Sequence, residues 1–207
     1  MLIGGLNKMS LIDYPGSVSA VIFTLGCNFK CPFCHNPELV LPEKFNTPMD
    51  EAEVFSFLEN RKGLLDGIVI TGGEPTIHND LPEFIRKIKN LGFKVKLDTN
   101  GTKPEVVKQL LEAGLLDFIA MDIKATFNKY KILSGCDTNL DKLVESIELI
   151  KASDIDYQFR NTFVKPLLTD SDATEIKKIT DTEVKFQEFV GDNKILDLSL
   201  LNKISDI

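Results

Sequence analysis

Three features that define other classes of protein are missing from this chain of 207 residues. It has no uninterrupted apolar run of about 20 residues, the length that spans a bilayer, so we do not expect the chain to cross a membrane. It has no excess of basic residues: the net charge is -7, which leaves no basic surface for phosphates and argues against nucleic acid as a partner. Residues 1–8 lack the basic head and apolar segment of a signal peptide, so we expect a cytoplasmic protein.

The composition is otherwise that of an ordinary globular protein. Hydrophobic residues make up 43% of the chain and charged residues 27%. This length suits one domain with a sizeable core, and the sequence contains no low-complexity segment or compositional linker. We therefore expect a single domain over residues 1–207, in which residues 191–207 form a tail that is compatible with either a docked helix or a frayed end.

Short apolar or β-branched runs alternate with amphipathic helical stretches along the chain. The expected strands cover residues 20–25, 67–71, 93–99, 117–123, 157–164 and 184–190. Helices are expected after Thr47-Pro48, from Leu81, from the capping-box pattern Thr102-Lys-Pro-Glu105, after Asn139, and from Ser171. Six strands with helical crossovers predict an α/β fold with a parallel sheet. Because a closed eight-stranded barrel typically needs about 250 residues, we expect an open, partial (β/α)6 barrel of the TIM-like kind.

Glycines and polar residues gather where these predicted strands end, which is where ligands bind in parallel α/β folds. The first predicted strand is followed by the cysteines, the second by Gly72, Gly73, Glu74 and Pro75, and the third by Asp98, Thr99, Asn100 and Gly101. The fourth ends with Asp122 and Lys124, the fifth contains Arg160 and Asn161, and the sixth contains Gln187. Their convergence on one edge of the sheet predicts a single site.

Three of the four cysteines lie in the predicted loop 26–37 as Cys27, Cys31 and Cys34. Cytoplasmic thiols stay reduced, so this cluster indicates a metal or redox site rather than a disulfide framework. Thiolates suit zinc or an iron–sulfur cluster, and a four-iron cluster held by three cysteines leaves one iron open to a ligand. The fourth cysteine, Cys136, stands alone and is expected to be an incidental thiol.

Other readings of the same cysteines stay open from the spacing alone. A closed zinc site would use His35 as its fourth ligand. A thioredoxin-like pair, Cys31 and Cys34, would leave Cys27 without a role. The same segment also matches c-type haem attachment, which is disfavoured without an export signal.

The pattern Cys27-x-x-x-Cys31-x-Phe33-Cys34 resembles the signature of the radical S-adenosylmethionine (radical SAM) superfamily. In that family the three cysteines hold a [4Fe–4S] cluster, and the amino and carboxylate groups of S-adenosylmethionine chelate the open iron. Reduction then cleaves the cofactor into methionine and a 5′-deoxyadenosyl radical. The resemblance implies cofactor contacts from Phe33 and from the Gly72-Gly73-Glu74 segment, whose backbone would bond the methionine amino group; glycine permits such a close approach.

Two further segments resemble the glycyl-radical-enzyme activases, one branch of this superfamily. These are Asp98-Thr-Asn-Gly101 and Asp122-Ile-Lys124. In that branch the two aspartates and the threonine hold a monovalent cation beside the cofactor carboxylate. The resemblance therefore implies such a cation at Asp98, Thr99 and Asp122, whose oxygen atoms suit a hard ion.

The remaining cofactor candidates are polar residues at the ends of the third to fifth predicted strands. The resemblance implies that Lys124 contacts the cofactor and places Asn100 beside it. Arg160 and Asn161 are candidates for its carboxylate or ribose, and the arginine fork is well suited to carboxylates. A structural ion pair is the equal alternative for Arg160.

The N-terminal part points to a narrower group. Segments 10–16, 20–27 and 34–37 resemble the activating proteins of anaerobic ribonucleoside-triphosphate reductase, and the match extends from Gly5 through the sixth strand. Such activases abstract hydrogen from a glycine of the partner enzyme, so the implied partner is that reductase, with a flavodoxin or ferredoxin as reductant.

Three alternatives remain for the function. One is an activase for another glycyl radical enzyme, such as pyruvate formate-lyase or a decarboxylase. Another is a small-molecule radical enzyme similar to 7-carboxy-7-deazaguanine synthase; that class usually has Asp-Thr where this chain has His35-Asn36, which counts against it. The third is a thiol-bound zinc module for protein interaction.

Overall fold

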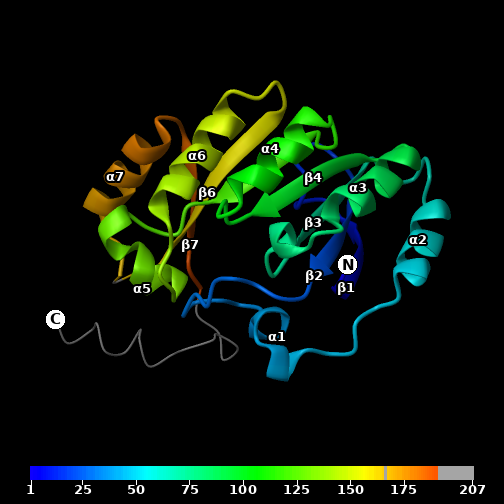
Figure 1. The fold of residues 1–207 in the computed structure, drawn as a ribbon, viewed down its shortest axis with the longest axis horizontal. Coiled ribbons are helices and arrows are strands. Elements are labelled where there is room, and N and C mark those ends of the chain that lie inside the picture. The colour runs from blue at the N-terminus through cyan, green and yellow to red at the C-terminus, as the bar shows by residue number, and fades with distance from the viewer. Residues whose placement is uncertain (166, 191–207) are drawn as a thin grey trace.

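The computed structural model describes residues 1–165 and 167–190, and the expected tail 191–207 lies outside this part of the chain. Its centre is one sheet with the strand order β1-β2-β3-β4-β5-β6-β7 (Figure 1). The strands are β1 (Ile3–Ser10), β2 (Ser19–Thr24), β3 (Gly67–Gly72), β4 (Lys94–Thr99), β5 (Phe118–Asp122), β6 (Asp156–Phe163) and β7 (Val184–Glu188). Strands β2 to β7 are parallel, so the α/β fold and the six-stranded open barrel are confirmed.

Strand β1 is an addition to the predicted sheet. It pairs antiparallel with β2, in a register that places Leu6 opposite Ile22, and it forms one edge of the sheet. The prediction of six strands was therefore one short. The reason lies in the sequence of β1, whose two glycines and run of exposed residues, Asn7 to Met9, give it little of the apolar character of the buried strands.

Helices connect the parallel strands and cover one face of the sheet (Figure 1). The helices are α1 (Pro37–Val40), α2 (Glu51–Glu59), α3 (Leu81–Asn90), α4 (Pro104–Glu112), α5 (Tyr130–Ser134), α6 (Leu140–Lys151) and α7 (Asp170–Thr180), with short 3-10 turns at Pro42–Lys44, Pro75–Ile77 and Phe127–Lys129. The predicted start after Asn139 is confirmed, because the Asn139 side chain accepts hydrogen bonds from the first turn of α6.

The main core lies between the sheet and these helices. Alternate strand residues such as Ile22, Ile70 and Leu97 are fully buried there, together with helix residues such as Ile85 and Leu110. Since successive residues of a strand point to opposite faces, the intervening residues form the inner face of the open barrel. That inner face therefore carries the side chains that can reach a ligand.

A small apolar cluster closes the inner face at the amino ends of the strands. It consists of Tyr14, Val21, Val69, Phe118 and Ala120, and the rings of Tyr14 and Phe118 meet edge to face with centroids 5.9 Å apart. The opposite end, at the carboxyl ends of the strands, carries the polar residues. Within residues 1–165 and 167–190, no helix combines the length and apolar character needed to cross a bilayer.

Candidate functional site

A cavity of about 310 Å³ lies at the carboxyl ends of the parallel strands. This volume is at the lower end of the range of about 300–1,000 Å³ typical of small-molecule sites. The lining residues come from the loop after β2 and from the ends of β3 to β7; they are Cys27, Phe29, Cys31, Phe33, Cys34, His35, Asn36, Val40, Thr71, Gly72, Gly73, Glu74, Asp98, Thr99, Asn100, Asp122, Lys124, Thr162, Gln187 and Glu188. The structure thus brings most of the predicted site residues together.

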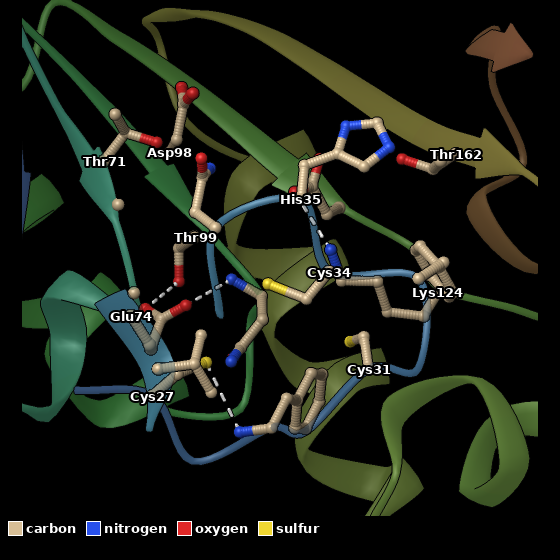
Figure 2. Close-up of a pocket in the computed structure, with 18 of the residues that line it drawn as sticks. Cys27, Cys31, Cys34, His35, Thr71, Glu74, Asp98, Thr99, Lys124 and Thr162 are labelled. Atoms are coloured by element: carbon tan, nitrogen blue, oxygen red, sulfur yellow. Dashed lines mark hydrogen bonds and ion pairs between the residues drawn. The ribbon is translucent and has the colours of Figure 1, made fainter. Parts of the chain in front are cut away.

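The three clustered cysteines all line this cavity. Figure 2 shows Cys27, Cys31 and Cys34 around one space, with Glu74 on one side and Lys124 on the other. In the protein without bound groups, burial raises the pKa of Cys27 to about 12, and the Glu74 carboxylate adds to the rise. Burial also raises the pKa of Cys31 to about 11 and that of Cys34 above its usual value. A ligated metal must therefore displace protons from these thiols.

The placement of three cysteines on one cavity matches the ligand set of an iron–sulfur cluster. Among the residues that the structure describes, no three His, Cys, Asp or Glu side chains lie close enough together to hold one metal ion. This finding covers the combinations of the three cysteines with His35. An iron–sulfur cluster occupies more space than one ion, and three cysteines around an open cavity match its ligand requirement.

The cysteine loop is held in place by its neighbours on both sides. At its start, the Gly26 amide donates to the Leu39 carbonyl at 2.7 Å. Further along, the Lys30 amide donates to the Ser134 carbonyl at 2.8 Å, at the end of α5. A Cβ at Gly135 would lie 2.0 Å from the Lys30 carbonyl oxygen, so only glycine allows α5 to end against the loop.

Two glycines at the end of β3 serve the packing of the backbone. A Cβ on Gly72 would lie 2.4 Å from the Thr24 nitrogen, and a Cβ on Gly73 would lie 1.9 Å from the Gly26 carbonyl oxygen. That oxygen accepts a 2.8 Å hydrogen bond from the Glu74 amide. Both glycines line the cavity, but the close approach that the structure shows is to β2 and the cysteine loop.

The Glu74 side chain is 1% exposed and ties two strand ends together. Its Oε1 accepts from the Thr76 amide at 3.1 Å, the Thr76 hydroxyl at 2.5 Å and the Thr99 hydroxyl at 2.7 Å. Its Oε2 accepts from the Asn100 amide at 2.7 Å. Burial raises the pKa of Glu74, and these hydrogen bonds partly oppose the rise. Through these bonds Glu74 connects the turn after β3 with the turn after β4.

Asn28 links the cysteine loop to the end of β4. Its Oδ1 accepts from Asn100 Nδ2 at 2.8 Å, and its Nδ2 donates to the Thr102 hydroxyl at 2.7 Å. The Thr102 hydroxyl in turn donates to Asn100 Oδ1 at 2.7 Å. The predicted capping box at Thr102 is therefore not formed: α4 begins at Pro104 with no side-chain cap, because Thr102 is engaged in this network. Sequence reasoning missed Asn28, which no motif singles out.

A chain of alternating charges crosses the inner face of β4, β5 and β6. Lys96 pairs with Asp98 Oδ1, and Arg160 donates from NH1 to Asp98 Oδ2 at 3.0 Å and from Nε to Asp122 Oδ1 at 2.9 Å. Lys124 Nζ completes the series with Asp122 Oδ2 at 3.2 Å. The predicted site residues Asp98, Asp122, Lys124 and Arg160 are thus joined in one network.

The electrostatics of this network favour the ionised forms of Asp122, Lys124 and Arg160. Burial alone would raise the pKa of Asp122, but Arg160 and Lys124 hold it well below its usual range. Burial would lower the pKa of Lys124, whereas Asp122 raises it above its usual value. The pKa of Arg160 is raised in the same way by Asp122 and Asp98. Buried charges persist where each is paired, as here.

Arg160 and Asn161 are not among the residues that line the cavity, and Arg160 forms ion pairs, the alternative that the sequence left open for it. Asn161 is 1% exposed, and its Nδ2 donates to the Ile123 carbonyl at 2.7 Å, so it faces the protein. Thr71 and Thr162 reach the cavity instead, and Gln187 lines it as well. The period of two along β6 could have identified Thr162, because it shares the inner face with Arg160.

Aromatic side chains cover the cysteine loop on the side of β7. The Phe189 ring lies 6.1 Å from that of Phe33 and 5.0 Å from that of His35, centroid to centroid. Phe33 is buried and lines the cavity, as does His35. Cys136 does not line the cavity; its Sγ lies 3.5 Å from the Asn28 carbonyl oxygen, against the outside of the loop.

Comparison with known proteins identifies the family. The model of the radical SAM superfamily matches residues 21–179, which includes the cysteine loop and the ends of β3 to β6. The chain belongs to the radical SAM superfamily. A protein of Methanocaldococcus jannaschii with the provisional name of a glycyl-radical enzyme activating enzyme is 40% identical over 86% of this chain and 74% of its own length. A second protein of that organism, with the same provisional name, is 33% identical over 86% of this chain and 67% of its own.

Two solved structures with bound S-adenosylmethionine (AdoMet) share the fold. Streptococcus suis SuiB bound to S-adenosylmethionine has a TM-score of 0.65 and 18% identity, with 90% of this chain and 46% of that chain covered. The structure of anSMEcpe with bound AdoMet has a TM-score of 0.62 and 20% identity, with 84% of this chain and 53% of that chain covered. The chain thus spans about half the length of these solved structures.

Proposed function

We propose that this chain is the activating enzyme of a glycyl radical enzyme, and that it cleaves S-adenosylmethionine reductively at a [4Fe–4S] cluster. The observation that carries the proposal is the placement of Cys27, Cys31 and Cys34 on one cavity whose other walls are the carboxyl ends of the parallel strands. The superfamily membership and the names of the two relatives from Methanocaldococcus jannaschii support it.

The residues of the chain have distinct tasks in this proposal. Cys27, Cys31 and Cys34 would hold the cluster, which supplies the electron for cleavage of the cofactor. The Phe189 ring packs on Phe33 and His35 of the cluster loop, and this aromatic contact would limit the access of water. Lys124 lines the cavity with a paired charge and can bond a carboxylate of S-adenosylmethionine.

The cofactor contacts proposed for the second and third strand ends are main-chain contacts. Gly72 and Gly73 line the cavity without side chains, which leaves their backbone accessible to the methionine part of the cofactor. Asn100 also lines the cavity, and Glu74 holds its amide in place. The monovalent cation implied for Asp98, Thr99 and Asp122 is not part of this proposal, because those side chains already have partners.

For the partner, we propose anaerobic ribonucleoside-triphosphate reductase, with a flavodoxin or ferredoxin as reductant. The support is the resemblance of the N-terminal segments 10–16, 20–27 and 34–37 to the activases of that enzyme. An open barrel suits a protein substrate, since a loop of the partner must reach the cavity. The proposal places the protein in the cytoplasm, where thiols stay reduced.

The test is to mix the anaerobically reconstituted, reduced protein with S-adenosylmethionine and the reductase encoded by the same organism. The expected result is a glycyl doublet in the electron paramagnetic resonance spectrum, and its absence in the Cys27→Ala variant. A doublet only on another glycyl radical enzyme would reassign the partner, whereas no doublet on any of them would refute the activase function.

A further inference from the structure

Each carboxylate oxygen of Asp98 and Asp122, the two aspartates on the inner face, has a cationic partner. Asp98 accepts from Lys96 on Oδ1 and from Arg160 NH1 on Oδ2, the latter at 3.0 Å. Asp122 accepts from Arg160 Nε on Oδ1 at 2.9 Å and from Lys124 Nζ on Oδ2 at 3.2 Å. Arg160 is the member that touches both aspartates.

The charges of this group already exceed neutrality. Lys96, Arg160 and Lys124 are three cations against the two carboxylates of Asp98 and Asp122, which leaves one net positive charge. A bound metal cation would add to this net positive charge, at short range and partly out of water. A carboxylate ligand, in contrast, would neutralise the excess.

The third expected cation ligand points elsewhere. Thr99 follows Asp98 on β4, so the two side chains leave the strand on opposite faces. The Thr99 hydroxyl donates to Glu74 Oε1 at 2.7 Å and accepts from the Gly101 amide at 3.2 Å. The three residues that the resemblance assigns to a monovalent cation therefore do not converge on one point.

We propose that the guanidinium of Arg160, which bridges Asp98 and Asp122, takes the place of a monovalent cation in this chain, so that S-adenosylmethionine binds without one. A planar guanidinium presents several donors in a fixed fork, so one side chain can satisfy two carboxylates on neighbouring strands. Parallel pairing of β5 with β6 places Arg160 directly opposite Asp122. Only the second part of this inference, that S-adenosylmethionine binds without a cation, rests on the proposed function.

The first measurement is the NMR line of thallium(I), a monovalent probe, titrated into the cluster-loaded protein. The wild type is expected to give no saturable broadening, whereas Arg160→Gln, which shortens the side chain and removes its charge, is expected to bind the ion. The matched control is Lys177→Gln, which removes one charge from the exposed ion pair with Glu183 and should behave as the wild type.

The second measurement is the affinity for S-adenosylmethionine in potassium chloride and in tetramethylammonium chloride at equal ionic strength. Binding of an ion and a ligand at coupled sites changes each affinity by the same factor, typically about 5–150-fold. The wild-type affinity should be the same in both salts. The Arg160→Gln affinity should be about tenfold higher in potassium, a factor within that range.

The outcomes separate the two proposals. Saturable thallium binding by the wild type, or a wild-type affinity for S-adenosylmethionine that depends on potassium, would overturn the role of Arg160. The role would also be overturned if Arg160→Gln, like the wild type, neither bound thallium nor responded to potassium. If Arg160→Gln does not fold, the wild-type measurements still decide. No binding of S-adenosylmethionine in any salt would instead refute the proposed function, while the thallium comparison would still test Arg160.

Discussion

Replacement of Glu74 is expected to loosen the junction between the cavity and the sheet. The carboxylate is buried and accepts four hydrogen bonds, from two groups of Thr76, from the Thr99 hydroxyl and from the Asn100 amide. In Glu74→Gln the amide nitrogen takes the place of one oxygen. If that nitrogen replaces Oε2, it faces the Asn100 amide. Two donors then stand where the wild type has a 2.7 Å hydrogen bond.

The magnitude follows from these contacts. A hydrogen bond to a charged group contributes about 1.5–3 kcal/mol, and a buried donor left without a partner costs about 1–3 kcal/mol. Removal of the buried charge offsets part of this, since burial already raises the pKa of Glu74. We expect the free energy of unfolding to fall by about 2–3 kcal/mol in Glu74→Gln, and by more in Glu74→Ala. This is a large share of the usual total of about 5–15 kcal/mol.

The assay is urea unfolding of the anaerobically purified protein, followed by circular dichroism. The matched control is Glu59→Gln at the exposed end of α2, for which we expect a change within about 0.5 kcal/mol. If Glu74→Gln proves no more destabilising than Glu59→Gln, then the hydrogen bonds of the carboxylate do not hold the two turns together and the reasoning fails.

Three further substitutions probe the loop that carries the cysteines. Gly73→Ala places a Cβ 1.9 Å from the Gly26 carbonyl oxygen and should reduce both the thermal midpoint and the iron bound after reconstitution. The control Gly5→Ala, whose Cβ meets nothing closer than 3.8 Å, should change neither. Equal behaviour of the two variants would contradict the packing argument. Asn28→Ala removes two side-chain links to the β4 turn and should lower iron retention during gel filtration by a measurable fraction, and unchanged retention would show that the links are dispensable. Cys136→Ala should leave the iron content unchanged, since this thiol lies outside the cavity, and a loss of iron would assign it a role at the cluster.

Most of the parallel sheet could be predicted because its strands are buried on both faces. Segments such as Ile68–Ile70 are apolar without interruption, which is typical of a strand covered on both sides. Strand β1 has one exposed edge and a mixed pattern, so its pairing with β2 depends on a partner distant in sequence. Local patterns do not contain that information.

The missed strand also explains an error in a helix boundary. The sequence Thr47-Pro48 suggested that a helix begins there, but α2 begins at Glu51 with Asp50 as its N-cap. The Met49 amide donates to the Ile3 carbonyl at 2.8 Å, which holds this segment extended against β1. A tertiary contact therefore prevails over the local preference for proline in the first turn.

The site was predictable in position but not in detail. Cysteines, glycines and acids after successive parallel strands indicate one location, because the fold brings the carboxyl ends of its strands to one edge. The partners of Arg160, by contrast, are set by the register of β4 to β6, which aligns Asp122 with Arg160. The sequence left Arg160 open between a ligand contact and a structural ion pair, and the structure shows it between two aspartates.

The most direct test of the central claim is the fate of S-adenosylmethionine on the reconstituted protein. The protein is loaded with iron and sulfide to about four irons per chain, as a three-cysteine cubane requires, and then reduced without oxygen. We predict that it converts S-adenosylmethionine into 5′-deoxyadenosine and methionine in equal amounts, and that Cys31→Ala does not. Intact S-adenosylmethionine after incubation with fully loaded, reduced wild-type protein would contradict the claim that this cavity is a radical SAM site.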